Sequence, residues 1–188
     1  MNTKETKKAE LEAPKWNDAT TLLDPENGYW KMLEIGDLIE FQRTYLGKNV
    51  YNHWVVYIGN LEVIEARPQK NLLKKLAKSD WIKKISLQEA TDNSRWRINH
   101  FLDEMYPPFE KQEIRKRAEE QLDPKTRTFP CYELTTSNCE HFCHLVRNGK
   151  SVSIQVEEKK LLHEVGKEIL SEVGELLGTL VINELPFW

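Results

Sequence analysis

The chain has 188 residues, 39% of them hydrophobic and 30% charged, with a formal net charge of −3. This length suits one globular domain with some polar tail; the charge gives no argument for nucleic-acid binding, and no stretch approaches the roughly 18 apolar residues of a membrane-spanning helix. Three cysteines, an odd number, and an N-terminus without an apolar run indicate free thiols in a reducing, cytoplasmic setting.

The first 30 residues carry no regular apolar pattern. Residues 1–15 are rich in lysine and glutamate, which indicates a mobile tail. Residues 16–30 combine apolar side chains with the turn cluster Asp24–Gly28. We therefore expect an irregular strap that packs onto the domain that follows.

Several segments rich in β-branched and aromatic residues predict strands. They are residues 38–41, 52–59, 61–66, 81–87 and 96–99. In the second segment, strand alternation places one set of side chains on one face and the intervening set on the other. The first set is His53, Val55 and Tyr57, and the second is Trp54, Val56 and Ile58.

Helix is expected in two further parts of the main domain. Residues 70–78 have lysines opposite leucines, as in a short amphipathic helix. Residues 109–122, after Pro107-Pro108, are rich in strong helix formers. Residues 128–134 should be extended and lead into the next helix, and Cys131 should sit in this strand.

The end of the chain repeats apolar residues at helical spacing over residues 155–180. Glycines weaken this helix, and glutamates interrupt its apolar stripe, so we expect intramolecular packing or helix pairing rather than a membrane anchor. The chain thus divides into a tail and strap over residues 1–30, a main domain over 31–150 and an amphipathic helical extension over 151–188.

Cys139 stands at the expected start of a helix that ends at Asn148-Gly149. Ser137 and Glu140 have the spacing of a capping box. The free amides and partial positive charge of a first turn favour an anion, and the thiolate is the nucleophilic form of cysteine. Cys139 is therefore a candidate nucleophile, with an inert buried cysteine as the alternative.

A cysteine nucleophile needs a base, and histidine suits that duty near neutral pH. His53, held on a strand, is the candidate. A further group should bond the far ring nitrogen and set the tautomer. Glu65 on the returning strand is the candidate for this role, and His100 is a second choice.

The hairpin between these two strands decides whether His53 and Glu65 share a face. A two-residue loop, Gly59-Asn60, would pair Trp54 with Glu65 and direct Glu65 away from His53. A three-residue loop ending at Leu61 would pair Val55 with Glu65 and make the two side chains diagonal neighbours within about 7 Å. We predict the three-residue loop.

Cys139, Cys143, His141 and His144 superficially suggest a metal site. Their spacing does not match the usual zinc patterns, and one short helix cannot turn all four side chains inward. We therefore expect no metal and no organic cofactor. Cys143 should be a packing neighbour of Cys139, and the two histidines should be structural or exposed.

Stretches in three parts of the chain resemble the lecithin retinol acyltransferase-like proteins, which include the small phospholipase A/acyltransferases. They are Gly36–Phe41, His53–Gly59 and Asn138–Phe142, within a resemblance that covers residues 33–150. The resemblance implies an α+β protein with a permuted papain-like (NlpC-type) thiol hydrolase fold, in which an antiparallel sheet packs against the cysteine-bearing helix. The main domain would then be the catalytic domain.

The resemblance also implies a reaction. Cys139 would attack an acyl ester of a glycerophospholipid, form a thioester and pass the acyl group to an alcohol, an amine or water. His53 corresponds to the family's general base, and Tyr51 falls where a family tyrosine has been suggested to hold the oxyanion.

One position departs from the family pattern. Family members usually carry a second histidine where this chain has Glu65. A carboxylate can accept from an imidazole and stabilise its cation, so an active enzyme is one interpretation. The other is a catalytically inactive protein that keeps the fold to bind a partner or a membrane. Amide or peptide hydrolysis is a third, because related thiol sites perform it.

The basic segment after the histidine hairpin is either a solvated face or a membrane contact. In the second interpretation, Lys70, Lys74, Lys75 and Lys78 bind anionic headgroups at about 1 kcal/mol each. The expected partners are thus a phospholipid substrate and, peripherally, a membrane surface.

Overall fold

The computed structural model describes residues 14–46, 48–68, 81–165 and 167. The expected N-terminal tail up to residue 13, the basic helix with its four lysines and most of the C-terminal extension lie outside these residues. Residues 1–152 and 153–188 form two compact units. In the second unit, a helix covers residues 154–165.

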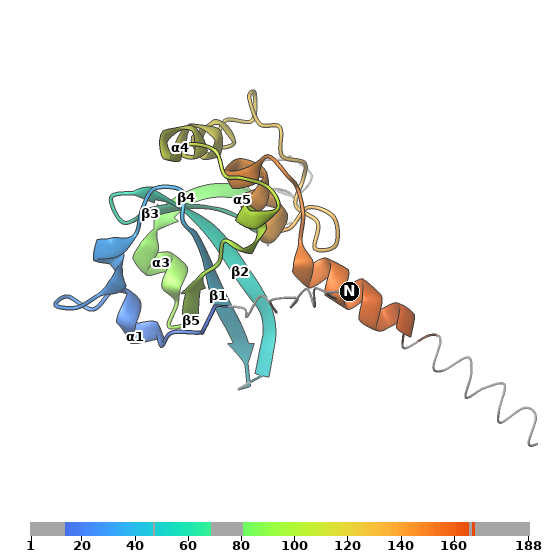
Figure 1. Cartoon of the computed structure of the whole chain (residues 1–188), viewed down its shortest axis with the longest axis horizontal. Helices are drawn as coiled ribbons and strands as arrows, with labels where there is room; N and C mark the ends of the chain where they lie inside the picture. The colour runs from blue at the N-terminus through green and yellow to red at the C-terminus, as the bar shows by residue number, and fades with distance from the viewer. Residues whose placement is uncertain (1–13, 47, 69–80, 166, 168–188) are drawn as a thin grey trace, which may run out of the picture. The chain divides into compact units, whose positions relative to one another are not determined.

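The first unit is built on a five-stranded sheet in the order β4-β3-β2-β1-β5, antiparallel throughout (Figure 1). The strands are β1 (Leu38–Tyr45), β2 (Lys48–Gly59), β3 (Glu62–Ala66), β4 (Ile82–Ser86) and β5 (Arg95–Ile98). All five expected strands are present, and β1 and β2 extend beyond the predicted ends into a long hairpin. The expectation for Cys131 was wrong, because this exposed residue lies outside the strands.

Short helices and two longer ones surround the sheet. They are α1 (Ala19–Leu22), η1 (Tyr29–Met32), α3 (Leu87–Thr91), η2 (Phe101–Glu104), α4 (Lys111–Glu120) and α5 (Cys139–Asn148). The sequence did not predict α3, which is too short to show a helical period; its first turn is capped by Ser86, whose Oγ accepts from the Glu89 amide at 3.1 Å. No helix in the described part of the chain is both long and apolar enough to span a bilayer.

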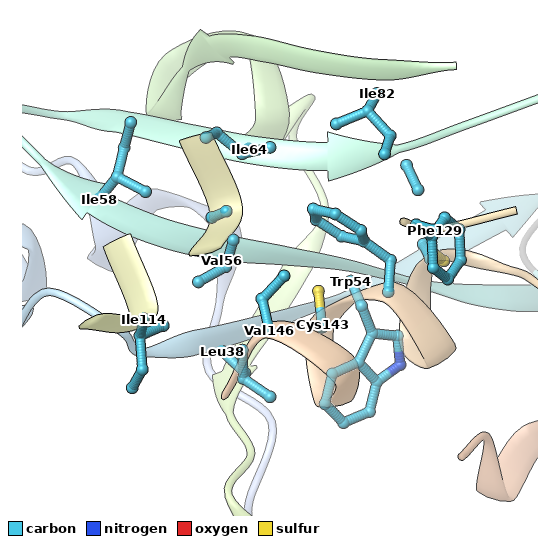
Figure 2. Close-up of a cluster of buried hydrophobic side chains, with 14 of the residues drawn as sticks. Leu38, Trp54, Val56, Ile58, Ile64, Ile82, Ile114, Phe129, Cys143 and Val146 are labelled. Atoms are coloured by element: carbon cyan, nitrogen blue, oxygen red, sulfur yellow. The ribbon is translucent and has the colours of Figure 1, made fainter. Parts of the chain in front are cut away.

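The two faces of the sheet carry separate cores, as the alternation in residues 52–59 predicts. Trp54 and Val56 point to the face covered by α4 and α5, where they pack with Val146 and other apolar side chains (Figure 2). Val55 and Tyr57 point to the opposite face, toward α1 and α3. The cysteine-bearing helix therefore packs against the sheet.

The strap packs onto the domain as expected. Asn17 forms an antiparallel bridge with Trp96 of β5, with N···O distances of 2.8 and 3.1 Å. The Trp96 indole donates to the Asp18 carbonyl at 3.1 Å, and the Tyr29 ring lies 5.0 Å from the Trp96 ring. These contacts close the apolar face of the sheet on the side away from α5.

His144 on α5 allows a prediction about stability. Its side chain is fully buried, with its ring 5.2 Å from that of Trp54 and 5.3 Å from that of Phe101. Burial lowers the pKa of His144 from 6.5 to about 4, so between these values the unfolded chain binds a proton that the folded chain does not. Stability should therefore fall as the pH drops from neutral toward 4, with a contribution from His144 on the order of 3 kcal/mol.

Urea unfolding of wild type and His144→Phe across this pH range checks the prediction. The variant should lose less stability on acidification, because it has no ring to protonate. An equal loss in both proteins would show that His144 does not carry the effect.

Candidate active site

Cys139 is the first residue of α5 and is 2% exposed. Asn138 caps the helix: its Oδ1 accepts from the amides of Glu140 and His141 at 3.0 and 3.1 Å, and Nδ1 of His141 accepts from the Asn138 amide at 3.3 Å. The capping box is real but was predicted one residue early. Ser137 instead hydrogen-bonds the Cys131 carbonyl, and so ties down the segment before the helix.

The buried histidines of α5 are structural. His141 completes the capping box, and His144 lies in the core, so neither is exposed. Among the described residues, no group of three or more His, Cys, Asp or Glu could hold a metal ion. Cys143, one turn beyond Cys139, is fully buried, and burial raises the pKa of its thiol well above the usual value.

The predicted register of the histidine hairpin is confirmed, since Val55 pairs with Glu65. The connection differs from the predicted three-residue loop. Asn60 and Leu61, both with positive φ, form a two-residue turn, and the register shifts between Tyr57 and Gly59. Because one strand has an extra residue at this irregularity, the pairing of Val55 with Glu65 is the same as a three-residue loop would give.

His53 and Glu65 are in direct contact on one face of the hairpin. Nε2 of His53 lies 2.7 Å from Oε2 of Glu65, and the two side chains are only 9% and 3% exposed. The alternative third member, His100, lies elsewhere: its Nε2 is 3.3 Å from the Leu38 amide nitrogen and 3.4 Å from Oδ1 of Asp37.

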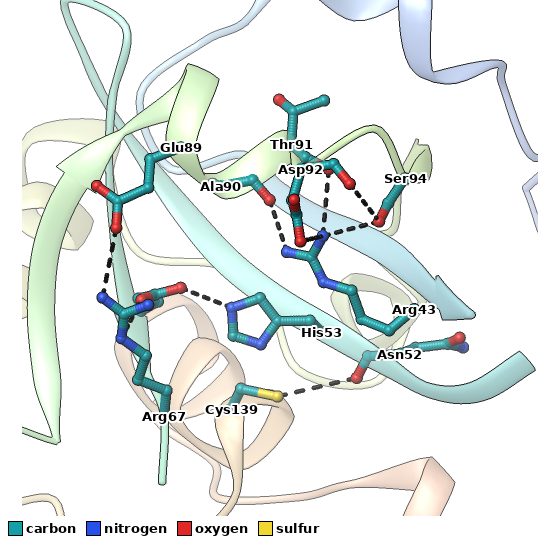
Figure 3. Close-up of polar contacts among 11 residues, drawn as sticks. Arg43, Asn52, His53, Arg67, Glu89, Ala90, Thr91, Asp92, Ser94 and Cys139 are labelled. Carbon is teal, nitrogen blue, oxygen red and sulfur yellow. Dashed lines mark hydrogen bonds and ion pairs between the residues drawn. The ribbon is translucent and has the colours of Figure 1, made fainter. Parts of the chain in front are cut away.

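The start of α5 brings Cys139 to the same histidine. β3 pairs with β2 no further than Val55, so the edge of β2 beside Asn52 is open to the helix. Sγ of Cys139 lies 3.9 Å from the Asn52 carbonyl oxygen and beside the His53 ring (Figure 3). Its interaction with the imidazole is one of the causes that raise the pKa of His53. Because Glu65 takes Nε2, the ring nitrogen that faces Cys139 is Nδ1.

The charges in this cluster favour a protonated imidazole. Burial lowers the pKa of His53, but hydrogen bonds with Cys139 and Glu65 outweigh burial and raise it to about 9. For Glu65, burial acts in the opposite direction and raises the pKa. The hydrogen bond to His53 and the charge of Arg67 outweigh burial and bring this pKa below its usual value. A cation on His53 is thus flanked by two groups that stabilise it as anions.

Two tyrosines, Tyr51 and Tyr132, lie near each other beside the site, and only Tyr51 was expected. Tyr51 precedes His53 by two residues on β2, so it shares the His53 face, and it is 43% exposed. Tyr132, in the segment before α5, is close enough to Cys139 for the two groups to interact. Burial, together with the charges of Cys139 and Tyr51, raises the pKa of Tyr132. Its irregular segment carries no spacing signal that could have identified it.

A buried acid supports the strand beside the cysteine. Glu40 on β1 is 1% exposed, and its carboxylate accepts from the side chains of Asn52 at 2.6 Å, Arg97 at 2.6 Å and Asn99 at 2.9 Å. Asn52 is the residue whose carbonyl contacts Cys139. The sequence signal for this role is an acid inside the apolar string of β1.

Comparison with known proteins identifies the family of the chain. Residues 31–152 match the family model described as lecithin retinol acyltransferase. The chain is 34% identical over 160 residues to phospholipase A and acyltransferase 4 of Homo sapiens, covering 81% of this chain and 87% of that protein. It is 33% identical over 146 residues to phospholipase A and acyltransferase 1 of Mus musculus, covering 74% and 79%. The chain therefore belongs to the lecithin retinol acyltransferase family.

Proposed function

We propose that this protein is a thiol-dependent phospholipid acyltransferase and phospholipase with a permuted papain-like fold. The observation that carries the proposal is the contact series from Cys139 through His53 to Glu65. Support at the family level comes from relatives whose names are phospholipase A and acyltransferase. Residues 31–150 would form the catalytic domain, preceded by the strap and followed by the helical extension.

In the first half-reaction, the Cys139 thiolate attacks the ester carbonyl carbon of a glycerophospholipid and a carbon–sulfur bond forms. The oxyanion would receive hydrogen bonds from the amide at the start of α5 and from the Tyr51 hydroxyl. The carbon–oxygen bond then breaks, and Nδ1–H of His53 gives its proton to the leaving lysophospholipid oxygen.

In the second half-reaction, the neutral His53 takes a proton from an alcohol, an amine or water. The deprotonated acceptor attacks the thioester carbonyl, the carbon–sulfur bond breaks, and the Cys139 thiolate and the His53 cation are restored. Glu65 accepts from Nε2–H in both steps, which keeps Nδ1 directed at the reacting groups and stabilises the cation.

This role for Glu65 favours an active enzyme over the inactive interpretation. The inactive interpretation rests on the missing family histidine, whereas Glu65 makes the contact that an orienting group requires, with 2.7 Å between Nε2 and Oε2. A cytoplasmic location with peripheral membrane contact through the lysines of residues 70–78 remains part of the proposal.

Trapping of the acyl enzyme tests the proposal. Wild-type protein mixed with phosphatidylcholine vesicles should gain one acyl mass on the peptide that contains Cys139, and hydroxylamine should remove it, as expected for a thioester. Cys139→Ala should give no adduct. Cys131→Ser is the matched control, because Cys131 is exposed and should keep full labelling.

Two results would contradict the proposal. One is an absence of acylation in the wild type under conditions in which Cys139 reacts with a small alkylating agent. The other is full lipid turnover by Cys139→Ala. A parallel screen of amide substrates separates acyl-ester chemistry from peptide or amide hydrolysis.

A further inference from the structure

The Glu65 carboxylate has a second partner that the acyl-transfer steps do not use. Oε2 faces His53, and Oε1 lies 2.9 Å from Nε of Arg67. Arg67 follows β3 directly, two residues beyond Glu65. Glu65 thus lies between the imidazole and a guanidinium.

Burial makes this second contact important. Glu65 is 2% exposed, and an isolated carboxylate at such a place would be costly to ionise. The groups that face it are His53 from β2, Arg67 from the end of β3, Arg43 from β1, Lys83 opposite it on β4 and Cys143 from α5. Besides His53, Arg67 is the member of this set with a described ion pair to Glu65.

Arg67 is itself held in place from two other directions. Its backbone amide donates to the Trp81 carbonyl at 2.8 Å, which fixes the end of the strand. Its Nη2 lies 3.5 Å from Oε1 of Glu89 in the first turn of α3. The guanidinium therefore lies within ion-pair distance of two carboxylates; its bond to Glu89 is a hydrogen bond, whereas Nε–H is not aligned as a hydrogen bond to Oε1 of Glu65.

We propose that Arg67 is a positioning residue, which holds the Glu65 carboxylate toward His53 and keeps it ionised in its buried site. The inference rests on the proposed function, because only an acyl-transfer site needs His53 oriented in this way. Arg67 would supply the charge and the geometry that allow a glutamate to stand where related chains usually have a histidine.

Removal of Arg67 should weaken the contact between His53 and Glu65 at acidic pH. Burial raises the pKa of Glu65; the hydrogen bond and charge of His53 oppose that effect first, and the charge of Arg67 adds to them. Without the guanidinium, Glu65 should protonate at a higher pH than in the wild type. Because the Arg67 side chain is 38% exposed, the change should be modest. A protonated Glu65 no longer stabilises the His53 cation.

Proton NMR of the His53 ring can measure this without any lipid. The Nε2 proton, which donates to Glu65 across 2.7 Å, should give a resonance far downfield that disappears when Glu65 is protonated. We expect the pH of disappearance to rise in Arg67→Met. The pH of disappearance should rise less in Glu89→Gln, which removes only the second partner of Arg67. It should also rise less in Arg67→Lys, which keeps the positive charge.

Lys84→Met is the matched control. It removes a cation from an ion pair at 3.2 Å with Glu62, which lies on the same strand as Glu65. Its resonance should behave as in the wild type. If Arg67→Met fails to fold, Glu89→Gln and Arg67→Lys carry the test, since Glu89 is a surface acid with 56% of its side chain exposed.

A resonance that disappears at the same pH in wild type and Arg67→Met would overturn the inference. In the acylation assay, Arg67→Met should lower kcat below neutral pH and leave KM unchanged. If the wild type forms no acyl enzyme but the NMR shift occurs, the proposed function fails and the role of Arg67 stands. If acylation occurs without the NMR shift, the reverse holds.

Discussion

Replacing His53 by glutamine should lower the rate of acyl-enzyme formation about a thousandfold. Glutamine cannot carry a proton from the thiol to the leaving oxygen, and it removes the cation that stabilises the thiolate. Single-turnover acylation by phosphatidylcholine vesicles, followed by mass spectrometry, gives the rate. The same loss should appear in alkylation of Cys139 by iodoacetamide at neutral pH, which needs no lipid.

A matched control is His163→Gln, which changes an exposed histidine on the helix of the second unit and should leave both rates unchanged. Retention of acylation by His53→Gln within about tenfold of wild type would contradict its role as the general base.

The pH dependence of stability gives an independent check on the same residue. The pKa of His53 is raised from 6.5 to about 9, so the folded chain holds a proton that the unfolded chain releases between these values. The stabilisation should be fully present below about pH 6.5 and lost as the pH rises toward 9. Urea unfolding of His53→Gln should lack this loss, and a loss equal to that of wild type would assign it to other groups.

Replacing Glu65 by glutamine should lower the acylation rate by about 10²- to 10⁴-fold, although the two side chains have nearly the same shape. The glutamate accepts from Nε2–H and leaves Nδ1 directed at Cys139. A glutamine amide can donate to Nε2, which favours the tautomer with its proton on Nδ1. That tautomer cannot accept a proton from the thiol or from the acyl acceptor.

Three variants test the role of Glu65 in the acylation assay. Glu65→Gln should show the full loss in kcat, whereas Glu65→His should keep more activity because an imidazole can again accept from Nε2–H. Glu62→Gln is the control, since Glu62 lies on the same strand in an exposed ion pair with Lys84. Equal activity of wild type and Glu65→Gln would remove Glu65 from the mechanism.

Much of this fold was predictable because the signals are local. Side chains alternate every second residue along a strand, so residues 52–59 indicated which of their members lie beneath α5. The stop signal at Asn148-Gly149 was correct, since Gly149 caps α5 in the left-handed conformation. The cap at the other end was missed by one residue, because Ser137 and Asn138 can both cap a helix and only the loop to Cys131 decides between them.

The sequence by itself determined the five strands, the helix that carries Cys139, the family and the candidates for its reacting groups. Tertiary structure decided which candidates are in contact. It placed Cys139 beside His53 and Glu65 between His53 and Arg67. It also placed Tyr132 and Glu40 near this group. The physical reason is that periodicity and capping act over a few neighbouring residues. The partners of a buried charge are set by which distant segments pack together, and no local pattern records that.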